Sequence, residues 1–133
     1  MTQTIVENEY ITLVYLPEKG VIYHTIHQPV EGQPLRDALL KGTAFLREHG
    51  VTKWLSDDRK NGPLSPEDAA WGIENWNQQT IEAGWKYWAN VVPKEVEAAG
   101  SLTPTMNSLY EMGLRMMVFS SLEEAFEWLD SLE

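Results

Sequence analysis

Hydrophobic residues recur with a period of two in some segments of this chain and near 3.6 in others, which predicts alternating strands and helices. The predicted strands are short and rich in β-branched and aromatic residues, as strands usually are. They cover residues 11–16, 21–26, 51–56, 85–93 and 116–119. The predicted helices cover residues 33–49, 66–83, 103–112 and the segment after Ser121. Residues 94–102 stay ambiguous between a loop and a helical turn.

Turn and cap residues at the ends of these segments support the assignment. Residues 17–20, Pro-Glu-Lys-Gly, predict a hairpin turn, because proline fixes its φ angle and glycine permits a positive one. Gly50 stands where a left-handed cap would end the first helix. Ser65 followed by Pro66 is a strong helix start, and Ser-Leu-Glu-Glu at 121–124 is a capping box.

The resulting order is ββαβαβαβα. Parallel neighbours need a helix-length connection, so we expect an α/β fold with an N-terminal β-hairpin, repeated αβ units and a mostly parallel five-stranded sheet. A single domain over residues 1–133 is expected, with residues 1–8 flexible. If the strand order is sequential, right-handed crossovers place every helix on one face of the sheet and leave the other open.

The charge of the chain narrows the classes of partner. Its formal net charge is −10, and residues 94–133 carry two basic and eight acidic side chains, a net of −6. Nucleic acid and anionic lipid are disfavoured because both repel an acidic surface. No apolar run is long enough for membrane insertion and no secretory signal begins the chain, so a cytoplasmic location is expected.

Cysteine is absent from the sequence, and this limits its chemistry. Disulfides, a thiolate nucleophile and a cysteine zinc site are all unavailable. The sequence also contains neither a Gly-x-Ser-x-Gly elbow nor a Gly-rich phosphate loop. We therefore expect a non-enzymatic protein without catalytic residues, metal or cofactor.

The element order, the length and the closing segment 119–129, Phe-Ser-Ser-Leu-Glu-Glu-Ala-Phe-Glu-Trp-Leu, resemble small bacterial proteins of the STAS superfamily. This is the fold of anti-sigma-factor antagonists, and the resemblance covers nearly the whole chain from Glu9. It implies a regulatory module that binds protein partners, with a small apolar ligand or lipid as the alternative.

Regulatory STAS proteins carry a phosphorylated serine at a helix start, typically inside Asp-Ser-Ser-Gly, and that motif is missing here. The resemblance maps this position onto Ser65, where a phosphate would gain free backbone N–H groups and the helix dipole. The favoured reading of Ser65 is a plain N-cap.

The corner between the strand 51–56 and the next helix is the best candidate for a functional surface. Ligands of open α/β sheets bind beyond the carboxyl ends of the strands. A third hypothesis, an enzyme or cation site, uses Asp57, Asp58 and Arg59 with Glu67 or Asp68 of the next helix. Adjacent strand residues point to opposite faces, however, so a salt bridge from Arg59 or Lys60 to these carboxylates is favoured. The candidate surface residues at this corner are Ser56, Asp57, Asp58, Arg59 and Ser65.

Histidines offer a weaker metal hypothesis. His24 and His27 are an odd number of residues apart, so a regular strand places them on opposite faces. His24 is in phase with Ile22 and Ile26 and is expected in the core. His49 is expected to act as a cation near a helix C-terminus.

Aromatic and methionine side chains supply the alternative ligand site. Trp54, Trp76 and Trp88, together with Met112, are expected to line an apolar cavity, and adaptable methionines suit such a surface. Alternation in the fourth strand places Trp85, Tyr87 and Val91 on one face and Trp88 and Val92 on the other. An aromatic sheet face left open would also suit a homodimer.

Overall fold

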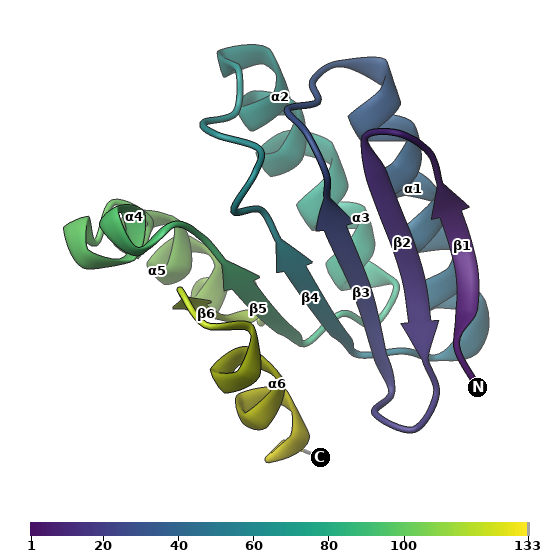
Figure 1. The fold of residues 1–133 in the computed structure, drawn as a ribbon. Coiled ribbons are helices and arrows are strands. Elements are labelled where there is room, and N and C mark those ends of the chain that lie inside the picture. The colour runs from purple at the N-terminus through teal and green to yellow at the C-terminus, as the bar shows by residue number, and fades with distance from the viewer. Residues whose placement is uncertain (133) are drawn as a thin grey trace.

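The computed structural model describes residues 1–132, which form an α/β fold around one six-stranded sheet (Figure 1). The strand order follows the sequence from β1 to β6. β1, β2 and β3 pair antiparallel, and β3 to β6 pair parallel. The strands are β1 (Gln3–Glu7), β2 (Ile11–Leu16), β3 (Val21–Ile26), β4 (Lys53–Asp57), β5 (Tyr87–Val91) and β6 (Arg115–Phe119).

The parallel strands are joined by helices, as their order requires. α1 (Gln33–His49) joins β3 to β4. Three consecutive helical segments join β4 to β5, namely α2 (Pro66–Trp71), the π-helical turn η1 (Gly72–Trp76) and α3 (Asn77–Glu82). The remaining helices are α4 (Lys94–Ala99), α5 (Thr103–Glu111) and α6 (Leu122–Asp130).

The prediction of five strands is wrong, because the described residues form six. Residues 3–7 form β1, which pairs with β2 from Gln3 opposite Tyr15 to Glu7 opposite Thr12. The strand carries only Ile5 and Val6 as half-buried apolar residues, so its own pattern is weak. Pairing with β2 supplies the backbone hydrogen bonds that make this edge segment a strand.

Caps and turns form where the sequence predicted them. Gly50 adopts φ 66° and its N–H bonds to the carbonyl of Leu46, which ends α1. Ser65 and Ser121 each accept the N–H of the residue three positions later, which is the N-cap geometry. The segment 94–102, which the sequence left ambiguous, contains the short helix α4.

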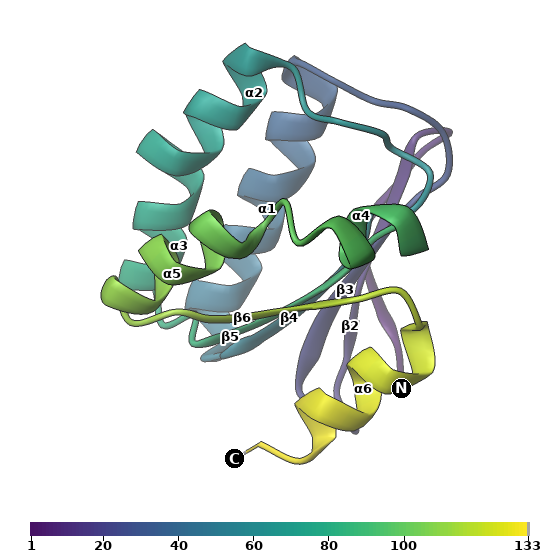
Figure 2. The ribbon, with the colours of Figure 1, turned by 90° about the vertical axis from the view of Figure 1, so that its left-hand side faces the viewer.

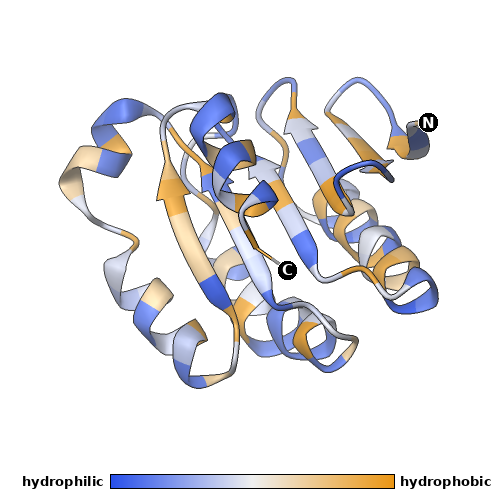
Figure 3. Ribbon diagram, turned by 90° about the horizontal axis from the view of Figure 1, so that it is seen from below, coloured by the Kyte–Doolittle hydropathy of each residue, from blue (hydrophilic) through white to orange (hydrophobic). Residues whose placement is uncertain are grey.

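The two sheet faces bury separate groups of side chains. α1, the segment from α2 to α3, and α5 cover one face, while α6 lies against the other (Figure 2). Hydrophobic and hydrophilic residues alternate along the helices, as expected where one side of a helix is buried (Figure 3). Alternation along β4 accordingly sends Trp54 to the first face and Leu55 to the second.

The expectation that a sequential sheet has every helix on one face is wrong for α6. This helix follows the last strand and is not a crossover, so no chain connection holds it on the crossover side. Ala125 and Leu129 of α6 pack on Leu55 and Ala89, and Phe126 meets Tyr23 edge-on with ring centroids 5.3 Å apart. The second face is therefore covered over its parallel half.

Candidate functional site

On the sheet face that the crossover helices cover, side chains of the parallel strands fall into two rows set by strand register. His24, Ser56 and Asn90 are cross-strand neighbours on β3, β4 and β5. One step toward the amino ends, Trp54, Trp88 and Met116 form the next row. Both rows face the crossover helices because strand side chains alternate between faces. Polar residues thus lie at the carboxyl edge of the sheet and apolar ones beneath it.

His24 is held in one protonation pattern by its two neighbours. The Nε1–H of Trp54 donates to His24 Nδ1 at 3.1 Å, so this nitrogen must be unprotonated. His24 Nε2 lies 2.8 Å from Asp58 Oδ1 and therefore carries the proton that it donates. The prediction that His24 lies in the core is confirmed, because it is only 3% exposed.

Asp58 receives a second donor on its other oxygen. Asn90 Nδ2 donates to Asp58 Oδ2 at 2.7 Å and to the carbonyl of Ser56 at 3.3 Å. The side chain of Asp58 is 30% exposed and no cation is paired with it in residues 1–132. A hydrogen-bonded chain therefore runs from Trp54 through His24 and Asp58 to Asn90.

Ser56 is fully buried and its hydroxyl accepts the indole N–H of Trp88 at 2.9 Å. A nucleophilic serine needs a hydrogen bond to a histidine with a free basic nitrogen. Both ring nitrogens of His24 are already occupied, by Trp54 and Asp58. Ser56, His24 and Asp58 therefore lack the serine-to-histidine hydrogen bond that a catalytic triad needs.

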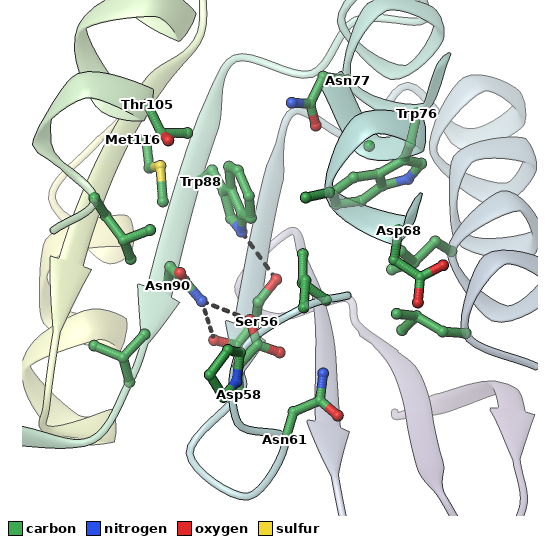
Figure 4. A pocket seen from close by; sticks show the side chains of 18 of the residues that line it. Ser56, Asp58, Asn61, Asp68, Trp76, Asn77, Trp88, Asn90, Thr105 and Met116 are labelled. Atoms are coloured by element: carbon green, nitrogen blue, oxygen red, sulfur yellow. Dashed lines mark hydrogen bonds between the residues drawn. The ribbon is translucent and has the colours of Figure 1, made fainter. Parts of the chain in front are cut away.

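A cavity of about 520 Å³ opens above these rows, between the α2–α3 segment and the α4–α5 segment (Figure 4). We call it the carboxyl-edge pocket. Its apolar lining comes from all the surrounding elements: Leu35, Leu39, Leu64, Ala69, Trp71, Ile73, Trp76, Trp88, Val92, Pro93, Val96, Leu102 and Met116. Its polar lining comprises His24, Ser56, Asp58, Asn61, Asp68, Asn77, Asn90, Ser101 and Thr105.

Four tryptophans at or beneath the pocket form one aromatic cluster, which does not include the pocket residue Trp71. Trp76 and Trp88 meet edge-on with centroids 5.7 Å apart, and both line the pocket. Trp54 is fully buried beneath Trp76, with centroids 5.2 Å apart, and does not reach the cavity. Trp85 joins the same cluster, 5.1 Å from Trp88.

Three predictions about these side chains are wrong, and the first is that Trp54 lines the cavity. Trp85 does not share a face with Tyr87 and Val91, because it precedes β5 and strand alternation does not govern it. Met112 does not line the cavity, because it follows the last turn of α5 and is 41% exposed. Met116, on the pocket side of β6, supplies the methionine instead.

Asp57 and Asp58 point to opposite sides of the sheet, as strand alternation predicts. The guanidinium of Arg59 donates to both oxygens of Asp57, at 2.9 and 2.7 Å, so the predicted salt bridge forms. Asp57 raises the pKa of Arg59 through these hydrogen bonds. Neither Asp57 nor Arg59 lines the pocket, and residues 1–132 contain no group of three or more metal-binding side chains.

Ser65 does not line the pocket; it caps α2, and its Oγ accepts the N–H of Asp68 at 3.1 Å. Asp68 is buried and ties α2 to α1 by accepting from the Gly32 N–H at 2.8 Å and from Arg36 Nε at 2.9 Å. Burial alone would raise the pKa of Asp68, but these hydrogen bonds and the Arg36 charge bring it below its ordinary value.

Asn77 is one of several polar pocket residues that the sequence did not predict, with Asn61, Asn90, Ser101 and Thr105. The π turn η1 precedes it, and the N–H of Asn77 bonds to the carbonyl of Gly72, five residues back. This wider turn brings Trp76 and Asn77, adjacent in sequence, into buried positions together. Asn77 is polar, so the hydrophobic pattern carried no signal for its burial.

Comparisons of the chain with family models, curated proteins and solved structures find no match. The site therefore has to be interpreted from its own geometry. Within the described part of the chain, no helix has both the length and the apolar character needed to cross a bilayer.

Proposed function

We propose that this protein binds a small, largely apolar molecule in the carboxyl-edge pocket. The observation that carries the proposal is a cavity of about 520 Å³ whose walls are mostly apolar and include the rings of Trp76 and Trp88. Cavities that bind small molecules span about 300–1,000 Å³ and have apolar walls with a few polar groups. The carboxyl edge of a parallel sheet is also where such ligands usually bind.

The polar floor supports binding rather than catalysis. His24 and Asn90 both donate to Asp58, and Ser56 accepts from Trp88. These hydrogen bonds fix the floor in one arrangement. A floor that is already organised loses little conformational freedom when a ligand arrives. The same hydrogen bonds leave no activated serine nucleophile at the floor.

Fluorescence titration with N-phenyl-1-naphthylamine, an uncharged dye that brightens in apolar surroundings, tests the proposal. The dye should bind saturably, with energy transfer from tryptophan, because Trp76 and Trp88 line the pocket. Gly72 is a helical pocket residue whose added Cβ would meet no atom within 4 Å, so Gly72→Phe should fill the cavity and abolish binding.

Ala70→Phe is the matched control, because Ala70 is exposed on the same helical segment and does not line the pocket. It should leave dye binding unchanged. Equal binding by Gly72→Phe and Ala70→Phe, or no saturable binding by the parent protein, would overturn the proposal.

A STAS-like protein-binding module is the second proposal. The sequential strand order and the helix after the last strand support the likeness. Leu64 and Ile73, which are 50% and 60% exposed at the pocket rim beside Ser65, offer an apolar contact surface. Native mass spectrometry of gently purified protein separates the two proposals. A small added mass supports a bound ligand. A bound second chain that is absent from the Ile73→Asp variant supports a protein partner.

A further inference from the structure

Asp58 places a carboxylate without a paired cation on the floor of the carboxyl-edge pocket. Its side chain lines the cavity and is 30% exposed, and it lies beside Ser56 and Asn90, below Trp88 in the view of Figure 4. Within residues 1–132, no lysine or arginine lines the cavity and none forms a salt bridge with Asp58. The floor therefore presents a negative charge to walls that are mostly apolar.

The donors that hold Asp58 in place leave this charge uncompensated. His24 Nε2 donates to Asp58 Oδ1 at 2.8 Å, and Asn90 Nδ2 donates to Asp58 Oδ2 at 2.7 Å. His24 stays neutral, because its Nδ1 accepts the indole N–H of Trp54 and carries no proton. A carboxylate accepts about four hydrogen bonds, so each oxygen of Asp58 keeps an acceptor position that no protein donor uses.

Two arginines near the pocket are paired with other carboxylates. Arg59 follows Asp58 directly, but it donates to both oxygens of Asp57, on the other side of the sheet. Arg36 donates to Asp68, the second pocket carboxylate, whose side chain is only 2% exposed. Of the two carboxylates that line the cavity in the described chain, only Asp58 is thus accessible to a positive group of a ligand.

The walls suit an aromatic ligand that carries a positive charge. Trp76 and Trp88 line the cavity with an interplanar angle of 88° between their rings, and Met116 pairs with Trp88 across the strands β5 and β6. Aromatic rings pack edge-on or offset against indole rings, and the faces of tryptophan attract ammonium groups. An anionic group would lose its hydration here and meet the like charge of Asp58.

We infer that the carboxyl-edge pocket selects an aromatic amine bound as its ammonium ion, whose N–H groups donate to the carboxylate of Asp58. The inference rests on the proposed function and adds the charge of the ligand. It distinguishes this amine from a neutral alcohol and from a carboxylate of the same ring system. The net charge of −10 also attracts cations to the whole surface, so the test must separate that attraction from Asp58.

Isothermal calorimetry with 2-naphthylmethylamine, 2-naphthalenemethanol and 2-naphthoate at neutral pH tests this order. The three probes share one ring system and differ in the group offered to Asp58. We expect the amine to bind about tenfold more tightly than the alcohol, because hydrogen bonds between charged groups are stronger than neutral ones. The carboxylate should bind most weakly.

Asp58→Asn keeps the shape of the side chain and removes its charge. The tenfold preference for the amine over the alcohol should fall to near one in this variant, and 2-naphthoate should bind more tightly. Glu67→Gln is the control, because it removes one negative charge from an exposed position of α2 that does not line the pocket. It should keep the preference. Thermal unfolding checks that both variants are folded.

A salt titration of the parent protein tests the same point without a substitution. In about 1 M salt the Debye length is about 3 Å, so attraction by distant surface charges is screened while a contact pair in the pocket is screened much less. The amine should therefore keep most of its preference over the alcohol at this salt concentration. Gly72→Phe should block the amine as it blocks the dye, since both occupy the same cavity.

The outcomes separate the inference from the proposed function. If N-phenyl-1-naphthylamine binds and Gly72→Phe blocks it, while the alcohol binds as tightly as the amine, the inference is wrong and the pocket function stands. The inference is also wrong if folded Asp58→Asn keeps the preference or if high salt abolishes it in the parent protein. Absence of saturable dye binding by the parent protein would end both proposals.

Discussion

The indole N–H of Trp54 donates to Nδ1 of His24 across neighbouring strands, at 3.1 Å and out of contact with solvent. This one bond decides which nitrogen of His24 carries the proton, and so which group faces Asp58. The polar floor of the pocket thus depends on a residue that does not line the pocket.

Nuclear magnetic resonance of the imidazole nitrogens tests this relationship. At pH 8 we expect His24 to show a protonated Nε2 and an unprotonated Nδ1. Trp54→Phe keeps an aromatic ring but removes the donor, so the tautomer preference should weaken. Loss of one buried hydrogen bond should also lower the free energy of unfolding by about 1–3 kcal/mol. A protonated Nδ1 in the parent protein would contradict the assignment.

Gly42 is required by the close packing of α1 on the sheet. A Cβ added there would collide with the Trp54 ring and lie 2.9 Å from Leu13 Cδ2. Gly42→Ala should therefore lower the free energy of unfolding by about 1–3 kcal/mol through overpacking, although alanine favours helices. Urea denaturation measures this change.

Ala44→Gly is the reference variant for Gly42→Ala. Ala44 is exposed on the same helix, so this change reports helix propensity alone and should cost about 1 kcal/mol. If Gly42→Ala were stabilising, as propensity alone predicts, α1 would have room to move away from Trp54.

Asp68 should make stability depend on acidic pH. Its pKa lies below the ordinary value, so the folded state favours the carboxylate. The stabilisation is present in full above the unfolded-state pKa, about 3.9, and is lost as the pH falls through the lower folded-state pKa. Asp68→Asn should be less stable than the parent by about 2 kcal/mol at pH 7, with the difference shrinking below about pH 4.

Chemical denaturation between pH 3 and 7, a range set by the ordinary carboxyl pKa, checks this dependence. Asp37→Asn serves as the control, because Asp37 is exposed on α1 and accepts only from Gln33. A constant difference between Asp68→Asn and the parent at all pH values would show that the charge of Asp68 plays no part.

Ser65→Ala should lower the free energy of unfolding by about 1 kcal/mol, because the hydroxyl caps α2. Ser121→Ala is the matched variant, since Ser121 caps α6 in the same way at 3.3 Å and should cost a similar amount. Phosphorylation of Ser65 stays a prediction. Loss of a protein partner from unmodified Ser65→Ala, with stability unchanged, would show that Ser65 is more than a cap.

Local sequence patterns determined most of the secondary structure. The bounds of β2, β3 and α1 agree with the prediction because residue alternation, helical spacing and Gly50 act over a few neighbours. The corner after β4 was also foreseeable, since Ser65 and Pro66 mark a helix start and Ser56 ends an apolar run. The salt bridge between Asp57 and Arg59 was predictable as well, because the two residues are only two positions apart in the sequence.

The tertiary structure decided what those local patterns could not reach. β1 is a strand only through pairing with β2, and α6 could dock on the second face because it joins no two strands of the described sheet. The row of His24, Ser56 and Asn90 joins three strands whose register is set by parallel pairing. The pocket and the unpaired amide of Asn77 depend on that register and on one π turn. Contacts between residues more than thirty positions apart set that register, and a pattern of local period carries no record of them.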